Sequence, residues 1–315
     1  MAHTTLIQQK FRDPFVTAKG EARGSVGWRG LKTLWLNTGT LCNIECRNCY
    51  IKSSPVNDDL AYLTLDDVTP FLDEIDALGE GAKEIGITGG EPFMCPDILA
   101  IMEAVLARGH SLLVLTNAMR PMMRPRIRQG LLALHAQYGR QMTLRVSMDH
   151  HAGAVHDAER GEGSFAAAME GLSWLAENGF GTALAGRQSL SEGEAEARAG
   201  YGRLIRRLGL GIDPADVKQL VLFPEMIEGD DPPEITTACW DILDVDPADM
   251  MCASQRMVVK RRGAEQAAIT ACTLLAYDKR FELGTTLTDA TSAPVQLNHA
   301  WCASFCVLGG GSCSA

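Results

Sequence analysis

The chain has 315 residues, of which 46% are hydrophobic and 22% charged, a balance typical of a globular protein with one large domain or a large and a small one. Its formal net charge is −10, and no nucleic acid partner is expected because binding nucleic acid needs clustered positive charge. No apolar run reaches the about 18 residues of a membrane span, and the start of the chain lacks the apolar stretch of a signal peptide. We therefore expect a soluble, cytoplasmic protein without a membrane partner.

Strand and helix patterns alternate between residues 33 and 223. Short apolar runs predict strands, and apolar residues recurring every three or four positions predict helices. Strands are expected at residues 33–39, 83–90, 111–117, 142–149, 180–187 and 217–223. Helices are expected at residues 63–78, 97–109, 121–137, 164–179 with Ser164 as the N-cap, and 192–208. The βα pattern repeated six times predicts an α/β fold with a parallel sheet, open or curled, whose functional residues lie at the carboxyl ends of the strands.

The pattern becomes irregular from about residue 250 onward, where glycines and cysteines are frequent. Residues 256–263 and 268–275 predict the two strands of a hairpin. This end has few large apolar side chains, and small domains of that kind usually need a metal centre to fold. We therefore expect a loosely packed lead-in at 1–30, an α/β domain at 31–235 and a small cysteine-rich domain at 236–315.

The ten cysteines gather near the two ends of the chain. Clustered cysteines in a reducing compartment favour metal or redox chemistry over disulfides. Cys42, Cys46 and Cys49 have the spacing C-x3-C-x2-C. Structural zinc usually takes four ligands, and no histidine lies close to these cysteines in the sequence. A [4Fe–4S] cluster held by three thiolates keeps one iron open to a ligand from outside the protein, so a cluster is expected and zinc is the alternative.

These cysteines, followed by the aromatic Tyr50, resemble the signature of radical SAM enzymes. A second motif, GITGGEPF at 86–93, resembles the GGEP segment of that family, which contacts the amino group of S-adenosylmethionine (SAM). The resemblance implies a partial (βα)6 TIM-like barrel that carries the cluster and SAM. The residues expected at the bound SAM are Tyr50, Gly89, Gly90, Glu91, Pro92, Thr116, Asn117, Ser147 and Arg187.

The resemblance also implies roles for some of these residues. The carboxylate of Glu91 is a suitable partner for the ammonium group of SAM, with an ordinary strand-end carboxylate as the alternative. Arg187 is expected to pair with the carboxylate of SAM, with a surface salt bridge as the alternative. Ser147 has the alternative of a plain core hydroxyl. Asp149 is expected where the substrate approaches, with His150 and His151, and a solvated loop is the alternative there. One electron, from a donor such as flavodoxin or ferredoxin, then cleaves SAM to a 5′-deoxyadenosyl radical that removes a hydrogen atom from the substrate.

A second site is expected near the C-terminus. The run HDAERGEGSF at 156–165 resembles the subgroup of radical SAM enzymes with C-terminal auxiliary clusters. The spacing C-x10-G-x8-C from Cys252 to Cys272 resembles, in a loosened form, the opening of a SPASM or twitch domain. The resemblance implies one auxiliary [4Fe–4S] cluster, with a structural zinc site as the alternative. Its candidate ligands are Cys252, Cys272, Cys302, Cys306 and Cys313.

The favoured function is a two-electron oxidation of a small molecule or peptide, with the auxiliary cluster as electron acceptor. One alternative is an epimerase in which Cys239 donates a hydrogen atom, although a buried cysteine is more often a core residue. Another is a non-catalytic iron–sulfur electron carrier, against which the GGEP segment argues. The first 30 residues are too short for a folded leader-peptide-binding domain, which lowers the expectation of a role in maturing ribosomal peptides. The substrate itself is not predicted.

Overall fold

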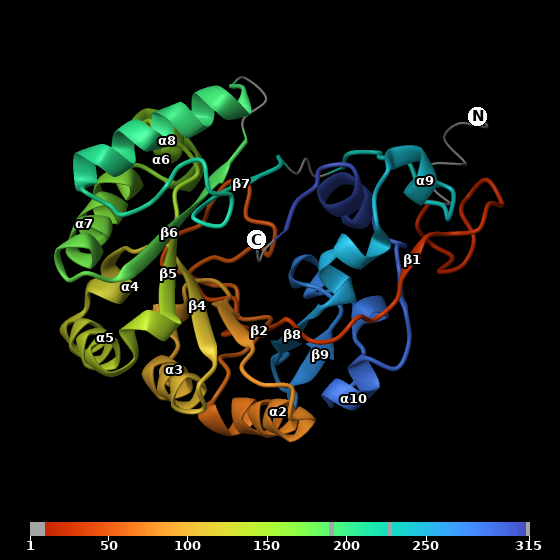
Figure 1. The fold of residues 1–315 in the computed structure, drawn as a ribbon, viewed down its shortest axis with the longest axis horizontal. Coiled ribbons are helices and arrows are strands. Elements are labelled where there is room, and N and C mark those ends of the chain that lie inside the picture. The colour runs from red at the N-terminus through yellow and green to blue at the C-terminus, as the bar shows by residue number, and fades with distance from the viewer. Residues whose placement is uncertain (1–9, 189–191, 226–228, 313–315) are drawn as a thin grey trace.

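The computed structural model describes residues 10–188, 192–225 and 229–312 (Figure 1). Its main element is an eight-stranded sheet in the order β7-β6-β5-β4-β3-β2-β8-β9. The longer helices lie along the outer side of this curved sheet (Figure 1). The strands are β2 (Thr33–Asn37), β3 (Glu84–Thr88), β4 (Ser111–Thr116), β5 (Met142–Ser147), β6 (Gly181–Arg187), β7 (Leu220–Phe223), β8 (Gln255–Val259) and β9 (Ala268–Thr270).

Strands β2 to β7 all run parallel, so the predicted α/β fold with a parallel sheet is confirmed. Each predicted helix is present, although the one at 121–137 is divided into α4 and α5 at Arg124, and α6 and α10 were not predicted. Within the described residues no helix is both long enough and apolar enough to cross a membrane. The helices are α2 (Leu65–Leu78), α3 (Ile98–Ala107), α4 (Arg120–Met123), α5 (Pro125–Tyr138), α6 (Gly153–Arg160), α7 (Ser164–Glu177), α8 (Glu194–Leu208), α9 (Cys239–Leu243) and α10 (Leu287–Ala290).

The start of α7 differs from the prediction by one residue. The helix begins at Ser164, and its N-cap is Gly163 at a φ of 79°. The capping oxygen comes from Asp157, whose Oδ1 accepts hydrogen bonds from the Phe165 amide at 2.7 Å and the Ser164 hydroxyl at 3.0 Å. A carboxylate from the preceding helix therefore does what a serine N-cap would do.

The predicted C-terminal hairpin is confirmed, because β8 and β9 pair antiparallel. In addition, β8 pairs in parallel with β2, the first strand of the α/β part. The hairpin thus extends the large sheet instead of forming a separate one. The division of the chain at residue 235 stays a prediction, and the sheet crosses it.

The N-terminal segment is not loosely packed from residue 10 onward, in contrast to the prediction. Strand β1 (Ser25–Val26) pairs with β10 (Val295–Gln296). Arg23 is buried and forms an ion pair of 2.6 Å with Glu234. These partners lie more than 200 residues away along the chain, so local sequence patterns contain no sign of them.

Candidate active site

The three N-terminal cysteines lie on the loop that follows β2, at the carboxyl end of the sheet. We call residues 38–55 the cysteine loop. Cys42 is buried, and Cys46 and Cys49 are half-buried. Burial raises the pKa of Cys42 to about 12 and also raises the pKa of Cys46. The thiols of Cys42 and Cys46 are therefore neutral by themselves at pH 7, and a metal centre that binds them as thiolates would release protons.

The turn after β3 holds the cysteine loop in place through backbone hydrogen bonds. The Gly90 amide donates to the Gly39 carbonyl at 2.8 Å, and the Glu91 amide donates to the Leu41 carbonyl at 3.2 Å. The turn must be glycine: a Cβ at Gly90 would lie 2.2 Å from the Leu41 carbonyl oxygen, and Gly89 has a φ of 138°. The two motifs singled out in the sequence are thus one structural unit.

Glu91 lies beneath the pocket described below rather than in its lining. Its side chain is buried, with 1% of its surface exposed. One carboxylate oxygen accepts from the Thr116 hydroxyl at 2.9 Å and the Phe93 amide at 3.2 Å, and the other accepts from the Asn117 amide at 2.9 Å. Burial raises the pKa of Glu91 to about 7. The expectation that this carboxylate meets an ammonium group therefore gains no support, since both oxygens already bind the end of β4; Pro92 is likewise buried.

Asn117 connects the end of β4 to the cysteine loop. Its side-chain amide donates to Asn43 Oδ1 at 2.9 Å and lies 3.9 Å from Cys42 Sγ. Its Oδ1 accepts from the Met119 amide at 3.0 Å. Glu91, Asn117 and Asn43 therefore form a largely buried chain of hydrogen bonds from the glycine turn to the first cysteine.

A pocket of about 640 Å³, open to solvent, lies above this network; we call it the first pocket. All three cysteines of the loop line it, and its other walls come from the ends of β3, β4, β5 and β6 and from α6. Among its described lining residues there is no further cysteine, histidine or carboxylate. The lining residues named by the sequence analysis are Cys42, Cys46, Cys49, Tyr50, Gly89, Gly90, Thr116, Asn117, Ser147 and Arg187.

Arg160, at the end of α6, is a lining residue that the sequence analysis did not single out, although the resembling run at 156–165 contains it. Its Nη2 donates to Asp149 Oδ1 at 2.9 Å, and Arg187 Nε lies 3.4 Å from the same oxygen. Arg187 also donates to the Asn48 carbonyl of the cysteine loop at 2.6 Å. Although burial opposes ionisation, the two guanidinium groups hold the pKa of Asp149 below its usual range. Two cations and one anion leave this wall with a net positive charge.

His150 and His151 do not line the pocket. Their Nε2 atoms lie 3.1 and 2.8 Å from the two oxygens of Glu192, and two histidines with a carboxylate are donors that bind divalent cations. However, the Ala152 amide donates to His150 Nδ1 at 2.9 Å. The neutral ring of His150 therefore keeps its proton on Nε2, directed at Glu192, and has no lone pair there for a cation. The contacts of His150 and His151 with Glu192 connect the loop after β5 to the segment before α8.

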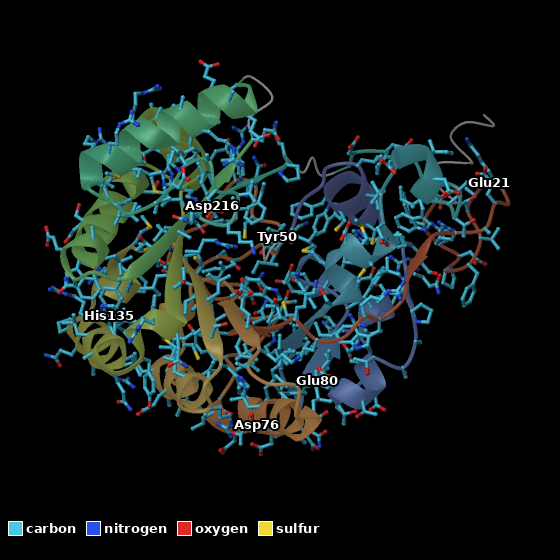
Figure 2. All side chains as sticks on the ribbon, in the orientation of Figure 1. Glu21, Tyr50, Asp76, Glu80, His135 and Asp216 are labelled. Atoms are coloured by element: carbon cyan, nitrogen blue, oxygen red, sulfur yellow. The ribbon has the colours of Figure 1, made fainter. Side chains whose placement is uncertain are left out.

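A second pocket adjoins the first on the side of the C-terminal segment. Five residues line both pockets: Tyr50, Leu115, Ser147, Arg160 and Arg187. Tyr50 lies centrally in the molecule, between the helix-covered sheet and the C-terminal segment (Figure 2). The remaining lining residues of the second pocket are Asp149, Ala185, Phe223, Pro224, Leu274 and Phe305.

A family model described as the radical SAM superfamily matches residues 36–186. This stretch, a little under half of the chain, is similar to the radical SAM superfamily, and we call it the radical SAM segment. It contains the cysteine loop, the glycine turn and the strand ends that line the first pocket.

Two curated relatives are similar to the radical SAM segment. AlbA of Bacillus subtilis (strain 168), an antilisterial bacteriocin subtilosin biosynthesis protein, is 29% identical over 140 residues, which are 44% of this chain and 29% of AlbA. The mycofactocin maturase MftC of Mycobacterium ulcerans (strain Agy99) is 30% identical over 142 residues, which are 45% of this chain and 36% of MftC. The matches thus span about a third of the length of these relatives.

Among solved structures, Streptococcus suis SuiB bound to precursor peptide SuiA has a TM-score of 0.56 and 13% sequence identity to this chain. The likeness covers 89% of this chain and 66% of SuiB. At this identity it shows a shared fold, which extends beyond the radical SAM segment into the C-terminal part.

Beyond the radical SAM segment, the structure brings further cysteines toward one apolar cluster. Cys252 and Cys302 are buried in it, and Cys272 and Cys306 pack against it. Burial raises the pKa of Cys302, and the neighbouring Cys272 and Cys252 raise it further. Cys302 and Cys306 are four residues apart on a π-helix (Cys302–Val307), so the C-x3-C spacing places both on similar sides of one helical segment. We call these four the auxiliary cysteines; Cys313 lies outside the described residues.

Cys239 is the first residue of α9, and its Sγ accepts a hydrogen bond from the Thr236 amide at 3.3 Å. It is not among the described lining residues of either pocket. A role for Cys239 as a hydrogen-atom donor therefore has no geometric support.

Proposed function

We propose that this chain is a radical SAM enzyme that holds a [4Fe–4S] cluster on Cys42, Cys46 and Cys49 and binds SAM in the first pocket. The observation that carries the proposal is the lining of that pocket. Three cysteines face it without a fourth protein ligand among the described residues, which suits a cluster with one iron open to SAM. With both groups bound, the site would supply a 5′-deoxyadenosyl radical able to remove a hydrogen atom from a substrate.

The residues around the pocket have separate tasks in this proposal. Gly89 and Gly90 allow backbone groups to approach SAM closely, because no side chain intervenes. Arg187 and Arg160 share one carboxylate, that of Asp149. The carboxylate of SAM would balance the remaining positive charge, with Arg187 as its partner. Once that charge is balanced, the wall shared by the two pockets is neutral overall.

The second pocket is the proposed substrate site. Its apolar walls come from β4, β6 and β7 and from the C-terminal segment. The ring of Phe223, on β7, lies 6.0 Å from the ring of Phe305, in the C-terminal segment. A charged group entering it would lose hydration without finding an uncompensated partner. We therefore propose that the reacting group is an uncharged, apolar part of the substrate.

A peptide is the favoured substrate class. The names of AlbA and MftC and the SuiB complex with precursor peptide SuiA support this choice. In a panel of peptides that differ at one position, a mass change is then expected at residues with apolar side chains and not at aspartate or lysine. Conversion confined to charged residues would contradict the proposed role of the second pocket.

The auxiliary cysteines are proposed to hold a second [4Fe–4S] cluster. Leu274 and Phe305 line the second pocket, and they neighbour Cys272 and Cys306 in the sequence. A cluster at this position would accept one electron from the substrate. Together with hydrogen-atom removal and the loss of one proton, this is a two-electron oxidation of the substrate, and a ferredoxin or flavodoxin would supply the electron that cleaves SAM.

Iron and sulfide analysis of anaerobically reconstituted protein tests both clusters. About eight irons are expected in the wild type and about four in a Cys42/Cys46/Cys49→Ala triple variant, because each cube holds four. Formation of 5′-deoxyadenosine after reduction with dithionite is expected only in the wild type. Iron that is unchanged in the triple variant, or the absence of 5′-deoxyadenosine from the wild type, would refute the proposed enzyme and favour an electron carrier.

A further inference from the structure

Arg256, on β8, is a buried cation that has no carboxylate partner within the described part of the chain. It is one of the largest fully buried side chains among the described residues, and 1% of the residue's surface is exposed. Among the described residues, no aspartate or glutamate lies within ion-pair distance of its guanidinium. By contrast, Arg23, the other deeply buried arginine at this end of the fold, pairs with Glu234 at 2.6 Å.

The groups that accept hydrogen bonds from Nε and Nη1 of Arg256 are neutral backbone carbonyls. Nε donates to the Ala290 carbonyl at 2.8 Å, and Nη1 donates to the carbonyls of Cys252 and Gln255, both at 2.7 Å. The guanidinium carbon lies 4.2 Å from the ring centroid of Trp28, a cation–π geometry. These contacts fix the position of the guanidinium but leave its charge uncompensated.

A buried charge without a counter-charge is costly, so an anion is expected beside it. Arginine stays protonated at neutral pH in proteins. The Nη1 of Arg256 lies 2.7 Å from the Cys252 carbonyl oxygen, so the guanidinium lies directly beside one of the auxiliary cysteines. Burial lowers the pKa of Arg256 to about 10, and the thiols of Cys252 and Cys272 act against that shift, in keeping with this position.

We propose that Arg256 is the electrostatic partner of the auxiliary cluster and raises its reduction potential. This inference rests on the proposed auxiliary cluster. A cluster with four thiolate ligands is negatively charged, and reduction makes it more so. A fixed positive charge in a buried setting stabilises the reduced form more than the oxidised one. The positive charge of Arg256 thus makes it easier for the auxiliary cluster, beside the second pocket, to accept an electron.

The neighbouring Arg280 does not offer the same effect. It also lies near the auxiliary cysteines: burial raises the pKa of Cys302, and Arg280 acts against that rise. However, it pairs with Asp278 at 2.6 Å and is about half exposed. Its charge is compensated and screened by solvent, so Arg256 remains the uncompensated cation among these two.

The test is a potentiometric titration in which electron paramagnetic resonance detects the reduced cluster. It uses the Cys42/Cys46/Cys49→Ala triple variant, in which the auxiliary cluster is the only one expected. Into this background we would place Arg256→Gln and Arg256→Met, which remove the charge, and Arg256→Lys, which keeps it. Arg262→Gln is the matched control, since it removes a positive charge from a side chain that is 63% exposed.

The midpoint potential is expected to become more negative in the Gln and Met variants and to change little in the Lys variant and the control. Midpoints of the Gln and Met variants equal to that of the parent would overturn the proposal. If the neutral variants fold, by circular dichroism, but lose iron while the Lys variant keeps it, the charge is needed to retain the cluster and the proposal stands. Loss of iron from all three Arg256 variants would show a packing role and overturn it. An iron-free parent variant would instead refute the proposed auxiliary cluster.

Discussion

The amide of Gly90 donates a 2.8 Å hydrogen bond to the carbonyl of Gly39, and this contact joins the glycine turn after β3 to the start of the cysteine loop. The turn therefore determines where the loop lies, in addition to forming a wall of the first pocket. The position of the cysteines depends on a residue more than 40 positions away in the sequence.

Gly90→Ala is accordingly expected to disrupt the first site. The added Cβ would lie 2.2 Å from the Leu41 carbonyl oxygen, and backbone at that distance must move. Iron content after reconstitution should fall from about eight to about four per chain, because the auxiliary cysteines are untouched. Gly211→Ala is the matched control, since no atom lies within 4 Å of the position that its Cβ would take. Full iron content in Gly90→Ala would show that the loop adapts to the change.

The sequence predicted both parts of this unit, because each is a local motif, but not the contact between them. Three cysteines on one loop, and two glycines after a strand, are visible without a structure. The role of Glu91 stays a prediction, because a carboxylate beside a ligand and a carboxylate that binds Thr116 and Asn117 look the same in a sequence. Only the packing of β3 against β4 decides between them.

Other features depend on contacts between distant segments. The pairing of β8 with β2 joins residues that lie 222 positions apart, as in Thr33 and Gln255. The anchoring of the N-terminal segment by Arg23 and Glu234 spans 211 positions. Arg160 lies in a helix that the apolar pattern did not reveal, because His156 is the only buried residue of α6. Periodicity reports which face of an element is buried, not which partner covers it.

Glu91→Gln tests the buried network beneath the first pocket. The substitution replaces one acceptor oxygen with an NH2 group, and the donors from Thr116, Phe93 and Asn117 then have one oxygen instead of two. A buried amide without an acceptor costs about 1–3 kcal/mol. The free energy of unfolding, measured by urea denaturation at pH 8, should fall by that amount. Glu103→Gln, on the exposed side of α3, is the control and should change it little; an unchanged value for Glu91→Gln would show that the network is not needed for stability.

Arg160→Gln tests the charge on the wall of the first pocket. Asp149 then has Arg187 as its charged partner, so the wall loses its net positive charge. Binding of SAM to the reconstituted protein, measured by equilibrium dialysis, should weaken about tenfold, which corresponds to about 1.4 kcal/mol. Arg198→Gln, which removes a surface pair with Glu194, should leave it unchanged. Decarboxylated SAM provides the decisive comparison: its affinity should be the same for wild type and Arg160→Gln, and an equal loss for both ligands would mean that the carboxylate is not recognised here.

His156→Phe tests the effect of pH on stability. Burial lowers the pKa of His156 to about 4 from an ordinary 6.5, so between these values the unfolded chain binds the proton that the folded protein does not. The stability that the neutral ring contributes is therefore present above pH 6.5 and is lost as the pH falls toward 4, by at most about 3 kcal/mol. Phenylalanine preserves an aromatic ring beside Phe165, whose ring centroid lies 5.6 Å away, and it does not titrate.

The melting temperature between pH 5 and 8 should therefore fall less steeply toward acid in His156→Phe than in the wild type. The control Val155→Ala, on the same helix, should shift the curve of melting temperature against pH without changing its slope. Parallel curves for His156→Phe and the wild type would mean that the ring accepts its proton in the folded protein as readily as in the unfolded one.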